Sequence, residues 1–213
     1  MTNQLEVYGV YNSRKRFMLR PLFFILVLLS TSLTFSQKGV FVGGSITIAG
    51  VSDLIQFQSL DGTEWYDNDE FRSVSLFVSK NITGRFSMEG GLNWSSHNMF
   101  RMPNVPPTVD ALPIPVDFQH IYVSLYARYT FLKVLFIQGG PLLGIHSSNK
   151  NGIDSQTGIG LGLGVGLDVD IVNKLSLFAL SFVNQHAIIS ASSATYPFRL
   201  NEMGIRAGIS FKL

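Results

Sequence analysis

Residues 38–213 alternate between apolar and polar or small side chains with a period of two over most of their length. This period indicates β-strands whose two faces meet different surroundings. The phase is blurred in one stretch, where Phe178, Leu180 and Phe182 interrupt it. We predict eight strands, which lie within residues 40–48, 73–79, 86–94, 121–130, 135–145, 159–171, 175–189 and 205–213.

Short and long connections alternate between these predicted strands. Tight turns are expected at residues 81–84, 131–132 and 172–174, and long polar or proline-rich loops at 51–70, 98–117, 147–156 and 190–200. Short turns at one end and long loops at the other are typical of bacterial outer-membrane barrels, and strands of about 10 residues match a tilted crossing of the bilayer. The sequence therefore predicts an all-β fold, an eight-stranded antiparallel up-and-down transmembrane β-barrel, since closure leaves no unpaired edge in lipid.

The alternative is a soluble periplasmic ligand-binding β-barrel with its apolar face inward. Only 14% of the residues are charged, whereas soluble domains average about 25%. The non-apolar face of residues 158–166 is glycine. Glycine has a poor strand propensity and offers water nothing to solvate, but in a narrow lumen it leaves room for Tyr122, Tyr126 and Phe136. We expect lumen charges of both signs, with Glu89 and Arg128 as a pair: Glu89, Arg128, Asp168, Asp170 and Arg206.

The first 37 residues have the order of a signal peptide. A basic front that includes Arg20 precedes an apolar run at residues 22–29, and small residues follow up to Ser36. We expect an N-terminal extension and signal peptide at 1–37, with a start at Met1 or Met18, and a barrel at 38–213. Residues 1–36 hold four of the 16 Lys and Arg and one of the 14 Asp and Glu, so the remaining chain has a formal net charge of −1. This charge gives no reason to expect a nucleic-acid partner.

The segment Phe136-Ile137-Gln138-Gly139-Gly140-Pro141-Leu142-Leu143-Gly144 resembles the Gly-Gly-Pro-aromatic-Leu-Gly motif of the PorT-like outer-membrane β-barrel family. Leu142 stands where that family usually has an aromatic residue. The glycine-alternating stretch 158–168 and the terminal stretch 204–213 are also similar to it. The resemblance implies an eight-stranded barrel in the outer membrane of a Gram-negative cell envelope. One member of the family is associated with protein secretion, and most have no assigned activity.

All four histidines fall at the ends of predicted strands beside long loops, where a cluster of neutral imidazoles is able to bind a transition metal. The other interpretation is a set of polar residues at the barrel rim. Parity directs His97, His120 and His146 into the lumen. His186 joins this cluster if Ser176, Phe178 and Phe182 also face inward.

One short motif favours an enzyme. His146-Ser147-Ser148-Asn149 is similar to the His-x-Ser-Asn element of lipid A 3-O-deacylases, in which a histidine activates a serine. That family places the element nearer the C-terminus, and here Glu202 is able to reach it only across the lumen. The simpler interpretation is that these four residues are the polar beginning of a loop.

The sequence therefore favours an integral outer-membrane protein with a structural or interaction role, linked to secretion or envelope assembly, over a lipid-modifying enzyme. A small-solute pore is disfavoured because eight strands enclose a lumen that side chains fill. We expect outer-membrane lipid around the barrel and a protein partner at the long loops. We expect no catalytic residue, no cofactor and no metal. The absence of Cys excludes disulfides and thiolate metal sites.

Overall fold

The computed structural model describes residues 39–56, 65–103, 112–149, 153–191 and 198–213. Within them, eight antiparallel strands form one closed ring, in which each strand pairs with its neighbours in sequence and β8 pairs with β1. The strands are β1 (Val40–Gln56), β2 (Trp65–Asn81), β3 (Phe86–Met102), β4 (Ile114–Phe131), β5 (Leu135–Asn149), β6 (Gly158–Val172), β7 (Leu175–Ser190) and β8 (Phe198–Lys212). The predicted fold class is confirmed.

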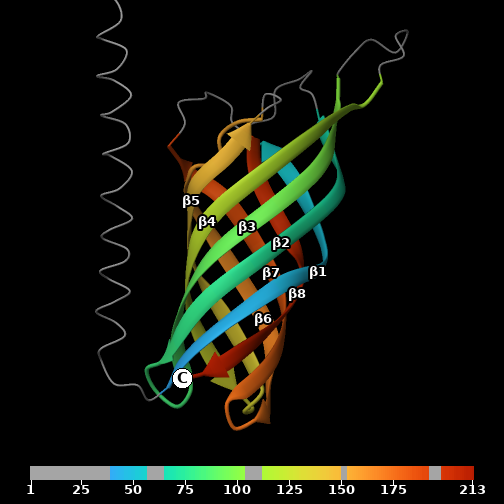
Figure 1. The fold of residues 1–213 in the computed structure, drawn as a ribbon. Coiled ribbons are helices and arrows are strands. Elements are labelled where there is room, and N and C mark those ends of the chain that lie inside the picture. Colours follow the sequence, from blue (N-terminus) through green and yellow to red (C-terminus); the bar gives the residue numbers. More distant parts are fainter. Residues whose placement is uncertain (1–38, 57–64, 104–111, 150–152, 192–197) are drawn as a thin grey trace, which may run out of the picture. The chain divides into compact units, whose positions relative to one another are not determined.

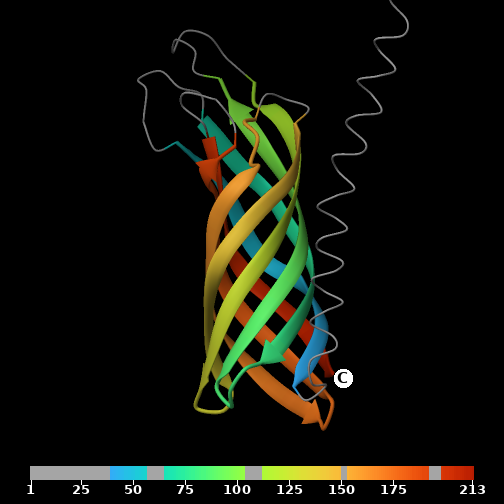
Figure 2. The ribbon, with the colours of Figure 1, turned by 90° about the vertical axis from the view of Figure 1, so that its left-hand side faces the viewer.

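Closure of the ring joins the two ends of the described barrel. The β1–β8 ladder runs from Phe41–Lys212 to Gln56–Phe198, with one bulge between Thr47 and Ala49. Figure 1 shows the blue β1 beside the red β8, and Figure 2 shows the same tilted strands from the side. No helix among the described residues is long and apolar enough to span a membrane.

The three predicted tight turns are present and lie at one end of the barrel, which we call the turn end. They connect β2 to β3, β4 to β5 and β6 to β7. In the second of these, Phe131 pairs with Leu135, so residues 132–134 form the connection, and Leu132 and Lys133 both have positive φ values, 52° and 68°. The opposite end, which carries the long connections, is the loop end.

Outward positions near the middle of the strands are mostly apolar and exposed. The exposed fractions of Leu76, Leu163 and Ile209 are 65%, 58% and 53%. The face that alternates with them is small, polar or aromatic and points into the barrel. The soluble alternative, with the apolar face inward, is therefore wrong for this part of the wall, because a surface of this kind is stable in lipid and not in water.

The strands are longer than predicted, at 15 to 18 residues. They continue into the stretches 51–70, 98–117, 147–156 and 190–200, which we expected to be loops. The reason is visible in β4, where Asp117 and Gln119 face outward and are exposed while Val116 and Phe118 face inward and are 1% exposed. At the loop end of β4 the wall is thus polar outside and apolar inside, the reverse of the lipid-facing zone. In Figure 1, β3 and β4 extend furthest in this direction.

Side chains fill the interior along its length. A loop-end core consists of Leu54, Met99, Val116, Phe118, Ile153 and Leu200. Below it lie a middle cluster of Tyr122, Tyr126 and Leu142 and a phenylalanine cluster of Phe71, Phe77, Phe136, Phe178, Leu180 and Phe182. The inward apolar residues of β7 explain why its phase is blurred in the sequence.

The inward glycines of β6 make room for this filling, as predicted for two of the three aromatic residues. A Cβ on Gly162 would lie 2.5 Å from the Tyr126 hydroxyl, and one on Gly166 would lie 2.6 Å from Phe136 Cζ. Both distances are too short for a real side chain. Glycine at these positions therefore allows the rings to cross a narrow lumen.

Candidate functional site

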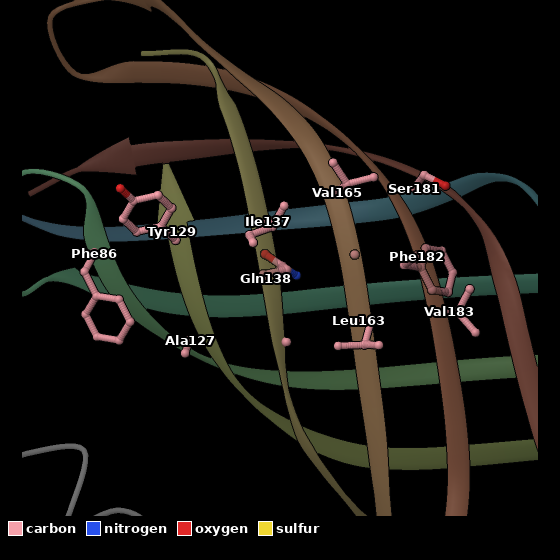
Figure 3. A pocket seen from close by; sticks show the side chains of 12 residues that line it. Phe86, Ala127, Tyr129, Ile137, Gln138, Leu163, Val165, Ser181, Phe182 and Val183 are labelled. Atoms are coloured by element: carbon pink, nitrogen blue, oxygen red, sulfur yellow. The ribbon is translucent and has the colours of Figure 1, made fainter. Parts of the chain in front are cut away.

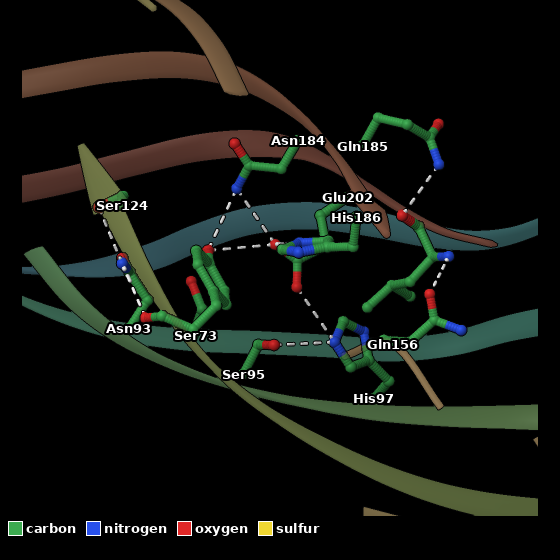
Figure 4. A network of polar contacts seen from close by, with 12 residues as sticks. Ser73, Asn93, Ser95, His97, Ser124, Gln156, Asn184, Gln185, His186 and Glu202 are labelled. Carbon is green, nitrogen blue, oxygen red and sulfur yellow. Dashed lines mark hydrogen bonds and ion pairs between the residues drawn. The ribbon is translucent and has the colours of Figure 1, made fainter. Parts of the chain in front are cut away.

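A cluster of buried polar side chains lies inside the barrel, directly below the loop-end core. Its centre is Glu202 on β8, whose exposed fraction is 0%. His97 Nε2 lies 3.2 Å from Glu202 Oε1, and His186 Nε2 lies 3.1 Å from Glu202 Oε2. We call Glu202, His97 and His186 the acid–imidazole cluster, and Figure 4 shows how the three side chains converge from β8, β3 and β7.

Neutral groups complete the surroundings of the Glu202 carboxylate. The Tyr122 hydroxyl donates to Oε2 at 3.3 Å, and Asn184 Nδ2 donates to the same oxygen at 3.2 Å. Asn184 Nδ2 also donates to the Tyr122 hydroxyl at 3.1 Å, and its Oδ1 accepts from Tyr126 at 3.3 Å. The network thus extends from the acid–imidazole cluster into the middle cluster, and burial strengthens such contacts.

Aromatic rings hold the imidazoles in place. Phe71 stacks on His97 with centroids 4.9 Å apart and an interplanar angle of 10°. His120, which is fully buried, stacks on Tyr122 at 5.4 Å and meets the His186 ring edge to face at 4.7 Å. Rings packed in this way have little freedom to turn.

A bulge in β7 positions His186. The β6–β7 pairing passes from Ile159–Ile189 to Leu161–Gln185, so β7 has two more residues than β6 between these pairs. Within this bulge Ala187 has a φ of 47° and is buried. A positive φ is unfavourable for alanine, and such bulges serve to direct a side chain.

A second polar cluster lies nearer the turn end, around Arg128. Arg128 Nη2 lies 2.8 Å from Glu89 Oε2, and Nη1 lies 3.3 Å from Asp168 Oδ2. Gln138 Oε1 accepts from Arg128 Nε at 3.2 Å and from Nη2 at 3.0 Å, while the guanidinium lies 4.0 Å from the centroid of the Phe136 ring. The structure thus brings together three of the five predicted lumen charges.

The other two predicted lumen charges lie apart from this cluster. Arg206 faces inward and is buried; its guanidinium lies 4.4 Å from the Phe182 ring centroid and 3.4 Å from the Ser73 hydroxyl. Asp170 differs from the prediction, because it is exposed near the turn end of β6 and accepts a hydrogen bond from Ser176 at 2.5 Å. The lumen opens to solvent there, so Asp170 is not a buried charge.

The histidines are placed differently from the rim cluster that we predicted. His97, His120 and His186 all face inward, but they are buried beneath the loop-end core, with exposed fractions of 0%, 0% and 1%. Ser176, Phe178 and Phe182 also face inward, which was the condition for His186 to join them. The backbone of His146 pairs with Ile121, and its side chain lies outside the described part.

Sequence reasoning missed Glu202 as the partner of the two imidazoles. The signal was present, because Glu202 has the same parity on β8 as Arg206 and Ser210, which face inward. The deacylase-like motif falls largely on undescribed side chains, those of His146, Ser148 and Asn149. In the described ranges, no three His, Asp or Glu side chains are arranged to hold a metal ion.

A hollow of about 520 Å³ lies outside the barrel. Its walls come from β3 to β7 and are mostly apolar, with Tyr129, Ile137 and Leu163 among the lining residues (Figure 3). The outward residues Ile137 and Leu163 belong to the lipid-facing surface. The hollow is therefore a depression in that surface, separate from the buried polar clusters.

No family model and no curated protein matches the chain. Among solved structures, it is similar to Neisserial surface protein A (NspA), with a TM-score of 0.50 and 16% identity over 83% of this chain and 98% of that one. It is also similar to the outer-membrane protein AlkL, whose structure was determined in lipid bilayers, with a TM-score of 0.51 and 11% identity over 82% and 91%. At these identities the likeness shows the fold.

The closed ring of eight strands, the apolar exterior and the filled interior define the class of protein. The chain is a small transmembrane β-barrel of the outer-membrane type.

Proposed function

We propose that the mature chain is an integral protein of the bacterial outer membrane with a structural or interaction role. The observation that carries this proposal is a barrel whose exterior is apolar and whose interior is filled from the loop-end core to the phenylalanine cluster. A filled barrel transmits no solute, and its buried acid and imidazoles meet no substrate. In the orientation usual for outer-membrane barrels, the loop end with its long connections faces the outside of the cell.

The wall that extends past the lipid zone supports an interaction role. Trp65 on β2 exposes 59% of its surface. Nearby on the same strand, Arg72 and Glu70 form an exposed ion pair of 2.5 Å. Tryptophan and arginine are both enriched in protein-binding surfaces. We infer that a protein partner in the envelope binds this face together with the long loops.

The resemblance to the PorT-like family is consistent with this proposal. Leu142 takes the position of the usual aromatic residue of the motif, and it is fully buried with Tyr122 and Tyr126 in the middle cluster. An apolar residue there serves the same packing. A signal peptide at 1–37 and a link to secretion or envelope assembly remain parts of the proposal; residues 1–38 lie outside the described residues.

Fractionation and conductance test the proposal together. The mature protein is expected in the outer-membrane fraction, with heat-modifiable migration on gels, and purified protein is expected to give no channel currents in planar bilayers. Recovery from the soluble periplasm would contradict the location, and stable currents would contradict the filled barrel.

The partner is sought with a photo-reactive amino acid at position 65, and the same amino acid at Leu76 in the lipid-facing zone serves as the matched control. We expect a cross-linked protein only from position 65. Equal products from both positions would contradict an interaction at this face.

A further inference from the structure

Part of the connection between β5 and β6 lies inside the mouth of the barrel. Ile153 is 2% exposed and belongs to the loop-end core with Phe118 and Leu200. Gln156 is fully buried. Its side chain contacts the backbone of Leu200, two residues before Glu202 on β8. Residues 153–157 therefore pack inward, where a surface loop would be exposed.

Side chains of this segment take the place of a missing strand partner. The β7–β8 ladder ends at Gln185–Asn201, so the first residues of β8, from Phe198 to Leu200, have no β7 partner on that side. Gln156 Oε1 accepts from the Leu200 amide at 2.8 Å, and its Nε2 donates to the Phe198 carbonyl at 2.9 Å. Asp154 Oδ2 accepts from the Phe198 amide at 2.9 Å. These contacts satisfy backbone groups that would otherwise be unpaired inside the mouth.

A glycine in the wall leaves space for residues 153–157. A Cβ on Gly144, which faces inward on β5, would overlap the carbonyl oxygen of Gln156 and lie 3.0 Å from His120 Cε1. The chain enters the wall again at Gly158, the first residue of β6, whose φ of 151° is unfavourable for residues with a side chain. At the same end of the segment, the Thr157 carbonyl accepts from the Ala191 amide at 3.0 Å.

We propose that residues 153–157 are an internal stopper, which closes the loop end of the barrel above the acid–imidazole cluster. The segment spans the mouth from β5 and β6 to β8 and fills the loop-end core from above. Its role is to keep external water from Glu202 and its two imidazoles, and it is not a binding loop. The remaining filling of the barrel, from Tyr122 to the turn end, does not depend on it.

The chain contains no cysteine, so a single introduced thiol reports on access to the lumen. Ser95 is fully buried and its hydroxyl lies 3.0 Å from His97 Nε2, just below the stopper. A Ser95→Cys protein is treated from the loop end with a small, membrane-impermeant thiol reagent. An Asp117→Cys protein, with its thiol exposed on the outer wall, gives the rate for free access.

We expect slow modification of Ser95→Cys when the stopper is intact. Gln156→Ala and, separately, Ile153→Ser are each expected to raise its rate on the order of tenfold, the effect of losing one or two buried interactions. Ser155→Ala is the matched control, because its hydroxyl contacts Thr157 within the segment at 3.0 Å, and it leaves the rate unchanged. Heat-modifiable migration verifies that each variant is folded.

Two results would overturn the stopper. One is modification of Ser95→Cys at the free rate of Asp117→Cys in the otherwise unaltered protein, a measurement that needs no stopper variant to fold. The other is an unchanged rate in folded Gln156→Ala and Ile153→Ser proteins. Conductance separates this inference from the proposed function, because the variants are still expected to carry no current.

Discussion

Replacement of Glu202 by alanine tests whether the acid–imidazole cluster holds the barrel together. The change removes the oxygens that the Tyr122 hydroxyl and Asn184 Nδ2 contact at 3.3 and 3.2 Å. It also removes the partner of His97 and His186 at 3.2 and 3.1 Å. All of these groups are buried, so water does not replace the lost contacts.

The magnitude follows from these contacts. A buried polar group left without a partner costs about 1–3 kcal/mol, which gives about 2–6 kcal/mol for the hydroxyl and the amide. Asn184 keeps its hydrogen bond to Tyr122, which limits the loss. We therefore expect Glu202→Ala to lower the free energy of unfolding by about 3 kcal/mol, and Glu202→Gln, which keeps an acceptor oxygen, by less.

Unfolding by urea in lipid vesicles measures the difference, with the fluorescence of Trp65 and Trp94 and gel migration as two independent signals. Glu70→Ala is the control, because Glu70 pairs with Arg72 on the exposed outer wall, where an ion pair contributes about 0–1 kcal/mol. A Glu202→Ala protein within about 1 kcal/mol of the unaltered one would refute a stabilising role for the cluster.

Three further changes test the wall itself. Gly140→Ala is expected to prevent folding, seen as loss of the heat-modifiable gel form, because a Cβ there would overlap the carbonyl oxygen of Leu125; a normal folded form would contradict this close approach. Ala187→Gly is expected to leave the free energy of unfolding unchanged or to raise it by up to about 1 kcal/mol, since φ is 47° at this residue. As a control, Ala179→Gly at an outward position should lower the free energy of unfolding by about 0.5–1 kcal/mol. An equal loss in Ala187→Gly and Ala179→Gly would count against backbone strain at Ala187. Deletion of residues 209–213 removes the β1–β8 pairs nearest the turn end and should abolish insertion, whereas protease protection of the truncated chain in the outer membrane would show that closure does not need them.

Alternation predicted the middle of the wall well, because lipid on one side and a narrow lumen on the other impose opposite demands on adjacent residues. The same parity places Glu89 and Arg128 inward, where they pair at 2.8 Å. Parity also indicates the position of the Glu202 side chain. Glu202 lies four residues before Arg206 and faces inward with it, so the acid was assignable to the lumen. The contact between this acid and His97 and His186 was not assignable, since the two histidines come from β3 and β7 and β7 contains a bulge that no residue pattern marks.

The strand ends were mispredicted for a physical reason. Beyond the lipid the outer face of the wall meets water, so polar residues such as Gln119 face outward and apolar residues such as Phe118 form the loop-end core. Alternation persists there with its polarity reversed, and a polar stretch of this kind resembles a loop when only one polarity is expected. The reversal indicates where the wall leaves the lipid. It also explains why the loop end needs a covering segment, because an apolar core that opened directly to water would be unstable.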